Sequence, residues 1–108
     1  MNTASNAEMD VTNWLNDVVA KNKAKQALLL LPKIKQRLAS LEPLYFELGC
    51  GQSGIHWKFA QDAIIYAYAN INKINRGEKH GDPLACISHA EFELDRLERL
   101  AKSKAINF

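Results

Sequence analysis

Three glycines at positions 49, 51 and 54 follow the spacing G-x-G-x-x-G. This spacing occurs in loops that let the backbone approach the phosphates of a nucleotide, with the N–H groups of a following helix facing the anion. The same stretch contains Cys50, and a position next to a helix N-terminus favours the reactive thiolate form of a cysteine. The chemistry to consider first is therefore nucleotide binding or nucleophilic catalysis.

The glycine motif, within residues 45–54, resembles the first motif of the class I methyltransferases, which binds S-adenosylmethionine. That resemblance implies a strand before the loop and a second strand that ends in an acid for the ribose hydroxyls. The segment before the loop has helical periodicity and ends at Pro43, and no acid lies between Asp62 and Glu78. The methyltransferase motif favours its third glycine at position 53, whereas this chain has Ser53 there and glycine at 54. The chain is also about half the length of a methyltransferase domain. We therefore expect no cofactor, and predict a connecting loop in which Ser53 caps the next helix.

Cysteine and histidine side chains offer two further kinds of site. Cys50 could pair with His56, His80 or His89 as a nucleophile and base, but no acid is placed to orient the histidine and no oxyanion hole is evident. Cys50, His56, Cys86 and His89 also supply the donors that zinc prefers, although the five residues between Cys50 and His56 form a loose spacing for a structural site. We predict no catalytic residue and no metal, with these four residues as the weak metal candidate.

Hydrophobic periodicity predicts an all-α fold, and no segment shows sustained strand alternation. The expected architecture is a small bundle of three long helices plus one or two short ones, with the glycine-rich loop before the third long segment. The helical segments are residues 7–20, 22–41, 53–75 and 83–104.

Prolines and glycines indicate where these helices bend or end. Pro32 predicts a kink or a break within the second segment, and Pro43 its end. Gly77 stands where a helix C-terminus favours a left-handed residue. Asp82 and Pro83 form an N-cap followed by proline at the first helical position.

Two helices carry more apolar surface than one core-facing stripe requires. In the segment 53–75, Ile55, Phe59 and Tyr66 lie nearly opposite the expected core face. Such a helix is either central and buried on both sides, or it uses the second stripe as an interface. In the last helix Phe92 lies away from the core face, and Arg96 and Arg99 are among its neighbours. An aromatic side chain flanked by arginines is typical of a binding hot spot. The predicted protein-binding residues are Phe59, Tyr66, His89, Phe92, Arg96 and Arg99.

Positive charge gathers in one part of the chain, because residues 18–41 contain no acid. Such a basic helix face could follow a nucleic-acid backbone, although the window holds no aromatic residue to stack on bases. Nucleic-acid binding is therefore the alternative function. Its candidate residues are Lys21, Lys23, Lys25, Lys33, Lys35 and Arg37.

The size and composition of the chain limit the remaining possibilities. With 108 residues we expect a single helical domain, with residues 1–6 as a disordered tail. The sequence shows no run long enough to span a bilayer and no signal peptide, and two cysteines are typical of a reducing, cytoplasmic setting. We expect a non-catalytic module, an adaptor, inhibitor or regulator, that docks onto another protein, including a second copy of itself as a homodimer.

Overall fold

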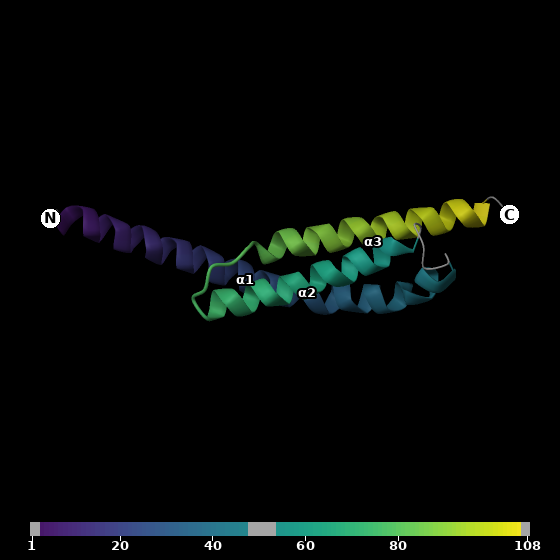
Figure 1. The fold of residues 1–108 in the computed structure, drawn as a ribbon, viewed down its shortest axis with the longest axis horizontal. Helices are drawn as coiled ribbons and strands as arrows, with labels where there is room; N and C mark the ends of the chain where they lie inside the picture. The colour runs from purple at the N-terminus through teal and green to yellow at the C-terminus, as the bar shows by residue number, and fades with distance from the viewer. Residues whose placement is uncertain (1–2, 48–53, 107–108) are drawn as a thin grey trace.

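The described part of the chain forms three helices, and Figure 1 shows how they are arranged. The computed structural model describes residues 3–47 and 54–106, with side chains at 11, 13–47 and 54–103. The helices are α1 (Thr3–Glu47), α2 (Ile55–Asn75) and α3 (Pro83–Ile106). These ranges contain no strand, so the predicted all-α bundle of three long helices is confirmed. No helix in these ranges is both long enough and apolar enough to cross a membrane.

The first helix is longer than the sequence predicts. The two segments expected at 7–20 and 22–41 are one continuous helix, which passes through both Pro32 and Pro43. The predicted break at Pro32 is therefore wrong, and the described ranges contain no additional short helix. Pro32 lies on the exposed side of α1, where the carbonyl that its ring leaves unpaired can bond to water. The helix begins at Thr3, inside the segment for which the sequence predicts a tail.

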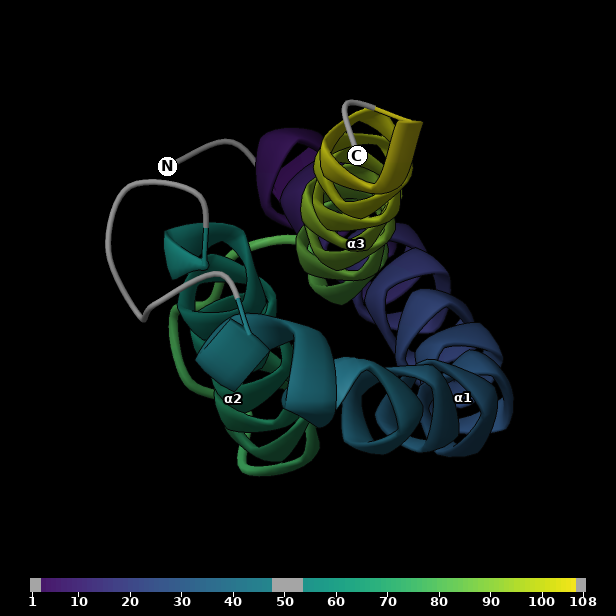
Figure 2. The ribbon, with the colours of Figure 1, turned by 90° about the vertical axis from the view of Figure 1, so that its right-hand side faces the viewer.

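The C-terminal end of α1 lies across the beginning of α2 (Figure 2). The indole Nε1 of Trp57 on α2 donates a hydrogen bond to the backbone carbonyl of Leu38 at 2.8 Å. The Trp57 ring also stacks on Tyr45, with ring centroids 5.3 Å apart. Pro43 cannot donate to the helical ladder and crowds the preceding turn. The helix nevertheless continues past Pro43 to Glu47, so the predicted end at Pro43 is wrong. The carbonyl of Leu38, in the turn before Pro43, accepts the hydrogen bond from Trp57.

The hydrophobic core consists of one apolar stripe from each helix, which the periodicity of the sequence predicts, together with Trp57 and Ala63, which it does not. Each stripe repeats at intervals of three and four residues, so it faces one side of its helix. All three helices contact one another. The buried members predicted from the pattern are Ala24, Ala27, Leu31 and Ile34 of α1, Ala60, Ile64, Ala67, Ile71 and Ile74 of α2, and Ile87, Ala90, Leu94 and Leu97 of α3.

The turn between α2 and α3 uses the residues that the sequence indicates. Gly77 has φ of 71°, and its N–H bonds to the carbonyl of Ile74 at 3.1 Å. The N–H of Glu78 donates to the backbone carbonyl of Lys73 at 2.9 Å, which completes a Schellman motif. At the start of α3, the carboxylate of Asp82 accepts a hydrogen bond from the N–H of Leu84 at 3.0 Å, as an N-cap should. Both predictions are confirmed. The N-cap of α2 is Gly54, and the predicted cap Ser53 lies outside the described residues, as do the first two glycines of the motif.

The N-terminal part of α1 projects beyond the ends of α2 and α3 (Figure 1). This arm makes the molecule 73 Å long, against 21 and 17 Å in the other two directions. The apolar periodicity predicted for the segment 7–20 is present in the helix, but its side chains do not join the core. The exposed apolar members are Val11, Trp14, Leu15 and Val19.

Candidate functional site

A groove runs between α2 and α3 on the side away from α1. It has a volume of about 510 Å³ and is lined by Phe59, Asp62, Ala63, Tyr66, Asn70, Ala85, Cys86 and His89. Phe59 is 42% exposed and Tyr66 is 64% exposed, so the described part of the chain does not cover α2 on both sides. The structure thus brings Phe59, Tyr66 and His89, which the sequence singles out separately, to one surface.

A second hollow is lined by residues of α3 alone. Its volume is about 320 Å³, and its walls are Phe92, Arg96, Arg99 and Leu100. Phe92 is 51% exposed. Neither Arg96 nor Arg99 forms an ion pair with another side chain in the described part of the chain. The two hollows lie on the same face of α3, because residues 85, 89, 92, 96 and 99 follow each other at intervals of four and three.

A buried carboxylate lies beneath this surface, and the sequence patterns do not reveal it. Glu93 of α3 is only 7% exposed. Its Oε2 lies 2.5 Å from Nδ1 of His56 on α2, and its Oε1 lies 3.7 Å from Nε2 of His89. Buried polar groups require such partners, so this contact fixes α2 against α3. Two features of the sequence point to this burial. Glu93 directly precedes Leu94 of the core stripe, and His89 lies four residues earlier on the same helix face.

The cysteine and histidine candidates do not assemble into a metal centre among the described residues. Cys50 lies outside the described ranges, and the remaining side chains form no group of three or more donors that could hold a metal ion. The thiol of Cys86 accepts a hydrogen bond from the Asn70 side chain at 3.6 Å. His80 lies in the exposed turn before α3, where its Nδ1 is 2.7 Å from the carbonyl of Gly81.

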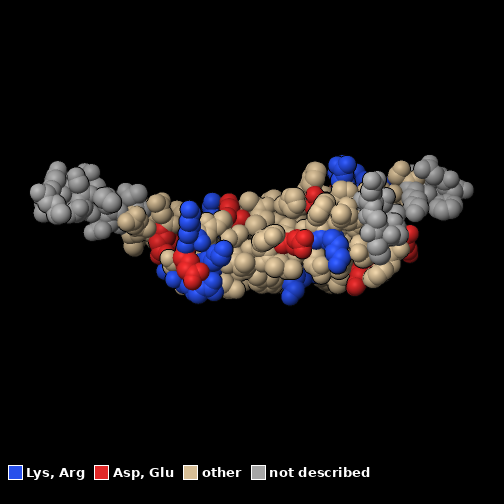
Figure 3. All heavy atoms as spheres, in the orientation of Figure 1, with Lys and Arg blue, Asp and Glu red and all other residues tan. Residues whose placement is uncertain are grey.

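The basic residues of α1 are spread around the helix rather than gathered on one free face. Lys21 pairs with Asp17 within α1 at 3.0 Å, and Lys23 reaches Asp82 at 3.4 Å. The ammonium group of Lys35 lies 5.5 Å from the centre of the Tyr68 ring on α2. Lys25 and Lys33 have no ion-pair partner among the described residues. Figure 3 shows the opposite face, where α2 lies in front of α1, and there too Lys and Arg side chains lie close to Asp and Glu side chains.

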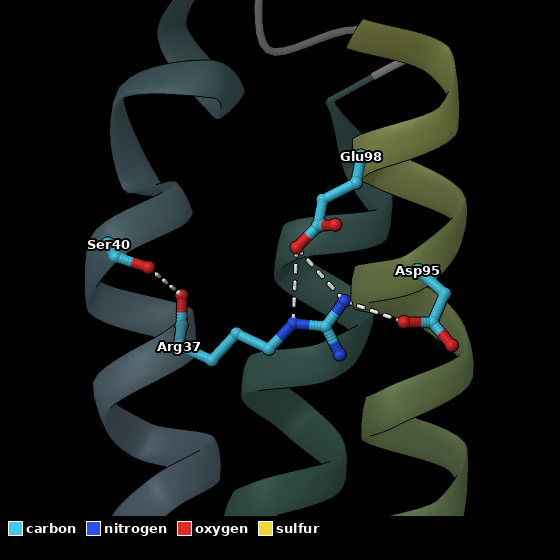
Figure 4. A network of polar contacts seen from close by, with 4 residues as sticks. All are labelled: Arg37, Ser40, Asp95 and Glu98. Atoms are coloured by element: carbon cyan, nitrogen blue, oxygen red, sulfur yellow. Dashed lines mark hydrogen bonds and ion pairs between the residues drawn. The ribbon is translucent and has the colours of Figure 1, made fainter. Parts of the chain in front are cut away.

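Arg37 forms the most extensive polar contact between helices (Figure 4). Its guanidinium donates to Asp95 at 2.6 Å and to Glu98 at 3.0 and 3.2 Å, both on α3. Partial burial lowers the pKa of Arg37, but the hydrogen bonds to Asp95 and Glu98 outweigh burial and raise this pKa above its usual value. Arg37 therefore joins α1 to α3, and this use competes with any contact to a nucleic-acid phosphate.

Comparison with known proteins reveals no relative of this chain: no protein-family model, no curated protein and no solved structure matches it.

Proposed function

We propose that this protein is a small non-catalytic interaction module that receives an amphipathic helix of a partner protein in the groove between α2 and α3. The observation that carries this proposal is the apolar groove lined by Phe59 and Tyr66, two large aromatic side chains that are left exposed although each lies on a packed helix. Aromatic residues in a hollow are typical anchors of protein interfaces. An adaptor, an inhibitor or a regulator in the cytoplasm would have these features.

The shape of the groove suits a helix. Three helices in contact leave one side of the α2–α3 pair uncovered, and a fourth helix laid there completes a four-helix bundle. Along α2 the exposed positions 55, 59, 62 and 66, and along α3 the positions 85, 89, 92, 96 and 99, both repeat at intervals of four and three. These are the intervals at which an incoming helix presents its own anchors, so side chains can interdigitate along the groove.

The charges around the groove define the chemistry of the partner helix. Arg96 and Arg99 border the hollow next to Phe92, and they have no acidic partner among the described side chains. An acidic residue on the partner can pair with these arginines, while its apolar stripe contacts Phe59 and Tyr66. Asp62 lines the groove on the opposite helix and favours a basic residue at that point. The partner is thus an amphipathic helix that is acidic where it lies on α3.

The test is a selection from a displayed library of amphipathic helical peptides, with leucine, phenylalanine or methionine in the apolar stripe and variable charge on its borders. We expect enriched peptides to carry acids on one border and to lose at least about tenfold in affinity when Tyr66→Ala or Phe59→Ala is introduced, because hot-spot truncations cost about 2 kcal/mol or more. Arg96→Glu should weaken the same peptides, and binding should return when the acidic border is changed to lysine. Fluorescence polarisation measures each affinity.

A matched control is Ile65→Ala, which removes a side chain that is 57% exposed on α2 but does not line the groove. Affinity should be unchanged in this variant. The proposal is overturned by a library that yields no binder, or by binders that respond equally to Ile65→Ala and Tyr66→Ala. The alternative function has its own outcome: a duplex or single-stranded oligonucleotide that binds at low salt and is lost on Lys25→Glu with Lys33→Glu would favour a nucleic-acid-binding module.

A further inference from the structure

The apolar stripe of the N-terminal arm lies on the opposite side of α1 from the core stripe. Val11, Leu15 and Val18 repeat at intervals of four and three, and the same intervals continue outward through Asn22, Lys25 and Leu29. At about 100° per residue these six positions centre roughly 180° away from the core-facing stripe that begins at Ala24. No rotation of α1 can therefore bury both stripes against α2 and α3.

This outer stripe of α1 carries a large apolar surface with no cover in the described chain. Leu29 is 81% exposed, Val11 57% and Leu15 49%, and only Val18 is half-buried. Further apolar residues border the stripe on both sides: Trp14, Val19 and Leu28. A projecting helix of this length is marginal in water when nothing packs on it, since most helical stability in proteins comes from tertiary contacts. The arm therefore requires a packing partner.

Charge along α1 selects a second copy of the same chain, laid antiparallel, as that partner. The sequence places Glu8, Asp10 and Asp17 in the first part of the helix and no acid from there to Glu42. On the outer side, Lys25 and Lys33 follow without an ion-pair partner in the described chain. A parallel pair would set Lys25 against Lys25 and Lys33 against Lys33, whereas an antiparallel pair sets the acidic part of one helix beside the basic part of the other.

The intervals along the stripe also match themselves in the antiparallel direction. With the twofold axis near residue 20, Val11 faces the partner's Leu29, Leu15 faces the partner's Lys25, and Val18 faces the partner's Asn22. A polar asparagine in such a seam favours one register over its neighbours. The six exposed apolar side chains of the stripe and its borders are each 46–81% exposed. Together they contribute on the order of 1,000 Å² when both copies are counted, which is about the area that a specific interface must reach.

We propose that this protein forms an antiparallel homodimer along the outer stripe of α1, with the arm of each chain lying on residues 18–29 of its partner. The groove between α2 and α3 stays free in this dimer, so the proposal is independent of the proposed function. In the middle of this interface Leu15 packs on the aliphatic part of Lys25, and Val18 packs on Asn22. These central contacts are weaker than the contacts between Val11 and Leu29 at both ends.

Analytical ultracentrifugation of the full chain over a concentration series tests the association. We expect twice the mass of one chain, and a monomer after Leu29→Asp, a change at an exposed position that leaves the core intact. The matched control is Ile65→Asp, on an exposed position of α2, which should still dimerise. Tyr66→Ala should also dimerise, so failure of this proposal and failure of the groove proposal give different results.

The direction of the pair is tested with nitroxide labels at Lys33→Cys, in a chain whose own cysteines are replaced by Cys50→Ser and Cys86→Ser. Antiparallel pairing about residue 20 separates the two labels by roughly 40 Å at 1.5 Å per residue, while parallel pairing brings them within roughly 10 Å. A short distance, a monomer at every concentration, or a dimer that survives Leu29→Asp overturns the proposal. A monomer that binds a different protein through Leu29 overturns it as well, and assigns the stripe to that protein.

Discussion

Glu93 illustrates how one polar residue can be required inside an apolar interface. Its carboxylate is nearly removed from solvent, and it lies between His56 of α2 and His89 of its own helix. A buried acceptor that loses its donor bears the full cost of desolvation, while a satisfied pair restricts how the two helices can slide. Beneath the groove, this contact determines the relative position of the walls that carry Phe59 and His89.

Replacing Glu93 with alanine should lower the free energy of unfolding by about 1–3 kcal/mol, because His56 is left without its buried partner. His56→Ala should have an effect of similar size, and the double variant should fall short of the sum, since the two residues share one contact. Urea unfolding of the four proteins measures this coupling. Glu91→Ala, an exposed position two residues earlier, is the control and should stay within about 0.5 kcal/mol of the parent. Additive effects of the two single variants would contradict the contact.

At the scale of the helices, the ends of α2 and α3 are specified by local chemistry. Gly77 adopts a left-handed conformation so that the N–H groups of residues 77 and 78 can satisfy the last carbonyls of α2. Asp82 then caps α3 a few residues later. These features require no knowledge of the tertiary structure, which is why the sequence locates both helix ends.

Replacing Gly77 with alanine should destabilise the protein by about 1 kcal/mol, because a Cβ atom is unfavourable at positive φ. The cause is conformational and not steric, since an added Cβ at this position meets nothing within 4 Å. Gly77→Asn, which tolerates the left-handed region better, should lose clearly less than alanine does. Thermal unfolding by circular dichroism compares the variants, and equal losses for alanine and asparagine would refute the explanation.

At the scale of the whole molecule, the three helices share one core, and the arm of α1 lies outside it. Leu94 is fully buried in this core. Leu94→Ala should therefore cost about 2–5 kcal/mol, since it removes transfer free energy and leaves a cavity that all three helices surround. Tryptophan fluorescence and circular dichroism should report the loss in urea. Ile65→Ala removes a comparable side chain from the surface and should change stability by about 0.5 kcal/mol or less; a small loss for Leu94→Ala would show that this helix is not packed as described.

Much of the candidate site could be predicted residue by residue but not as a surface. Helical periodicity alone shows that Tyr66 and Phe92 face away from the core stripes of their helices. Whether another helix covers Tyr66 depends on the number and direction of the neighbouring helices. The periodicity of α2 alone gives no information about either. Glu93 was missed for a related reason, because its burial results from the approach of His56 on a different helix.

The sequence by itself determined the helical class, the core stripes of the packed segments, and the caps at Gly77 and Asp82, because each depends on contacts within a few residues. Only the tertiary structure decided that residues 3–47 form one helix through Pro32 and Pro43, since an exposed proline costs less when water and packing compensate for it. It also decided that the stripe beginning at Val11 faces away from the bundle while the stripe beginning at Ala24 faces into it. Two apolar stripes on opposite sides of one helix cannot share a core, so which of them is buried follows from the placement of α2 and α3.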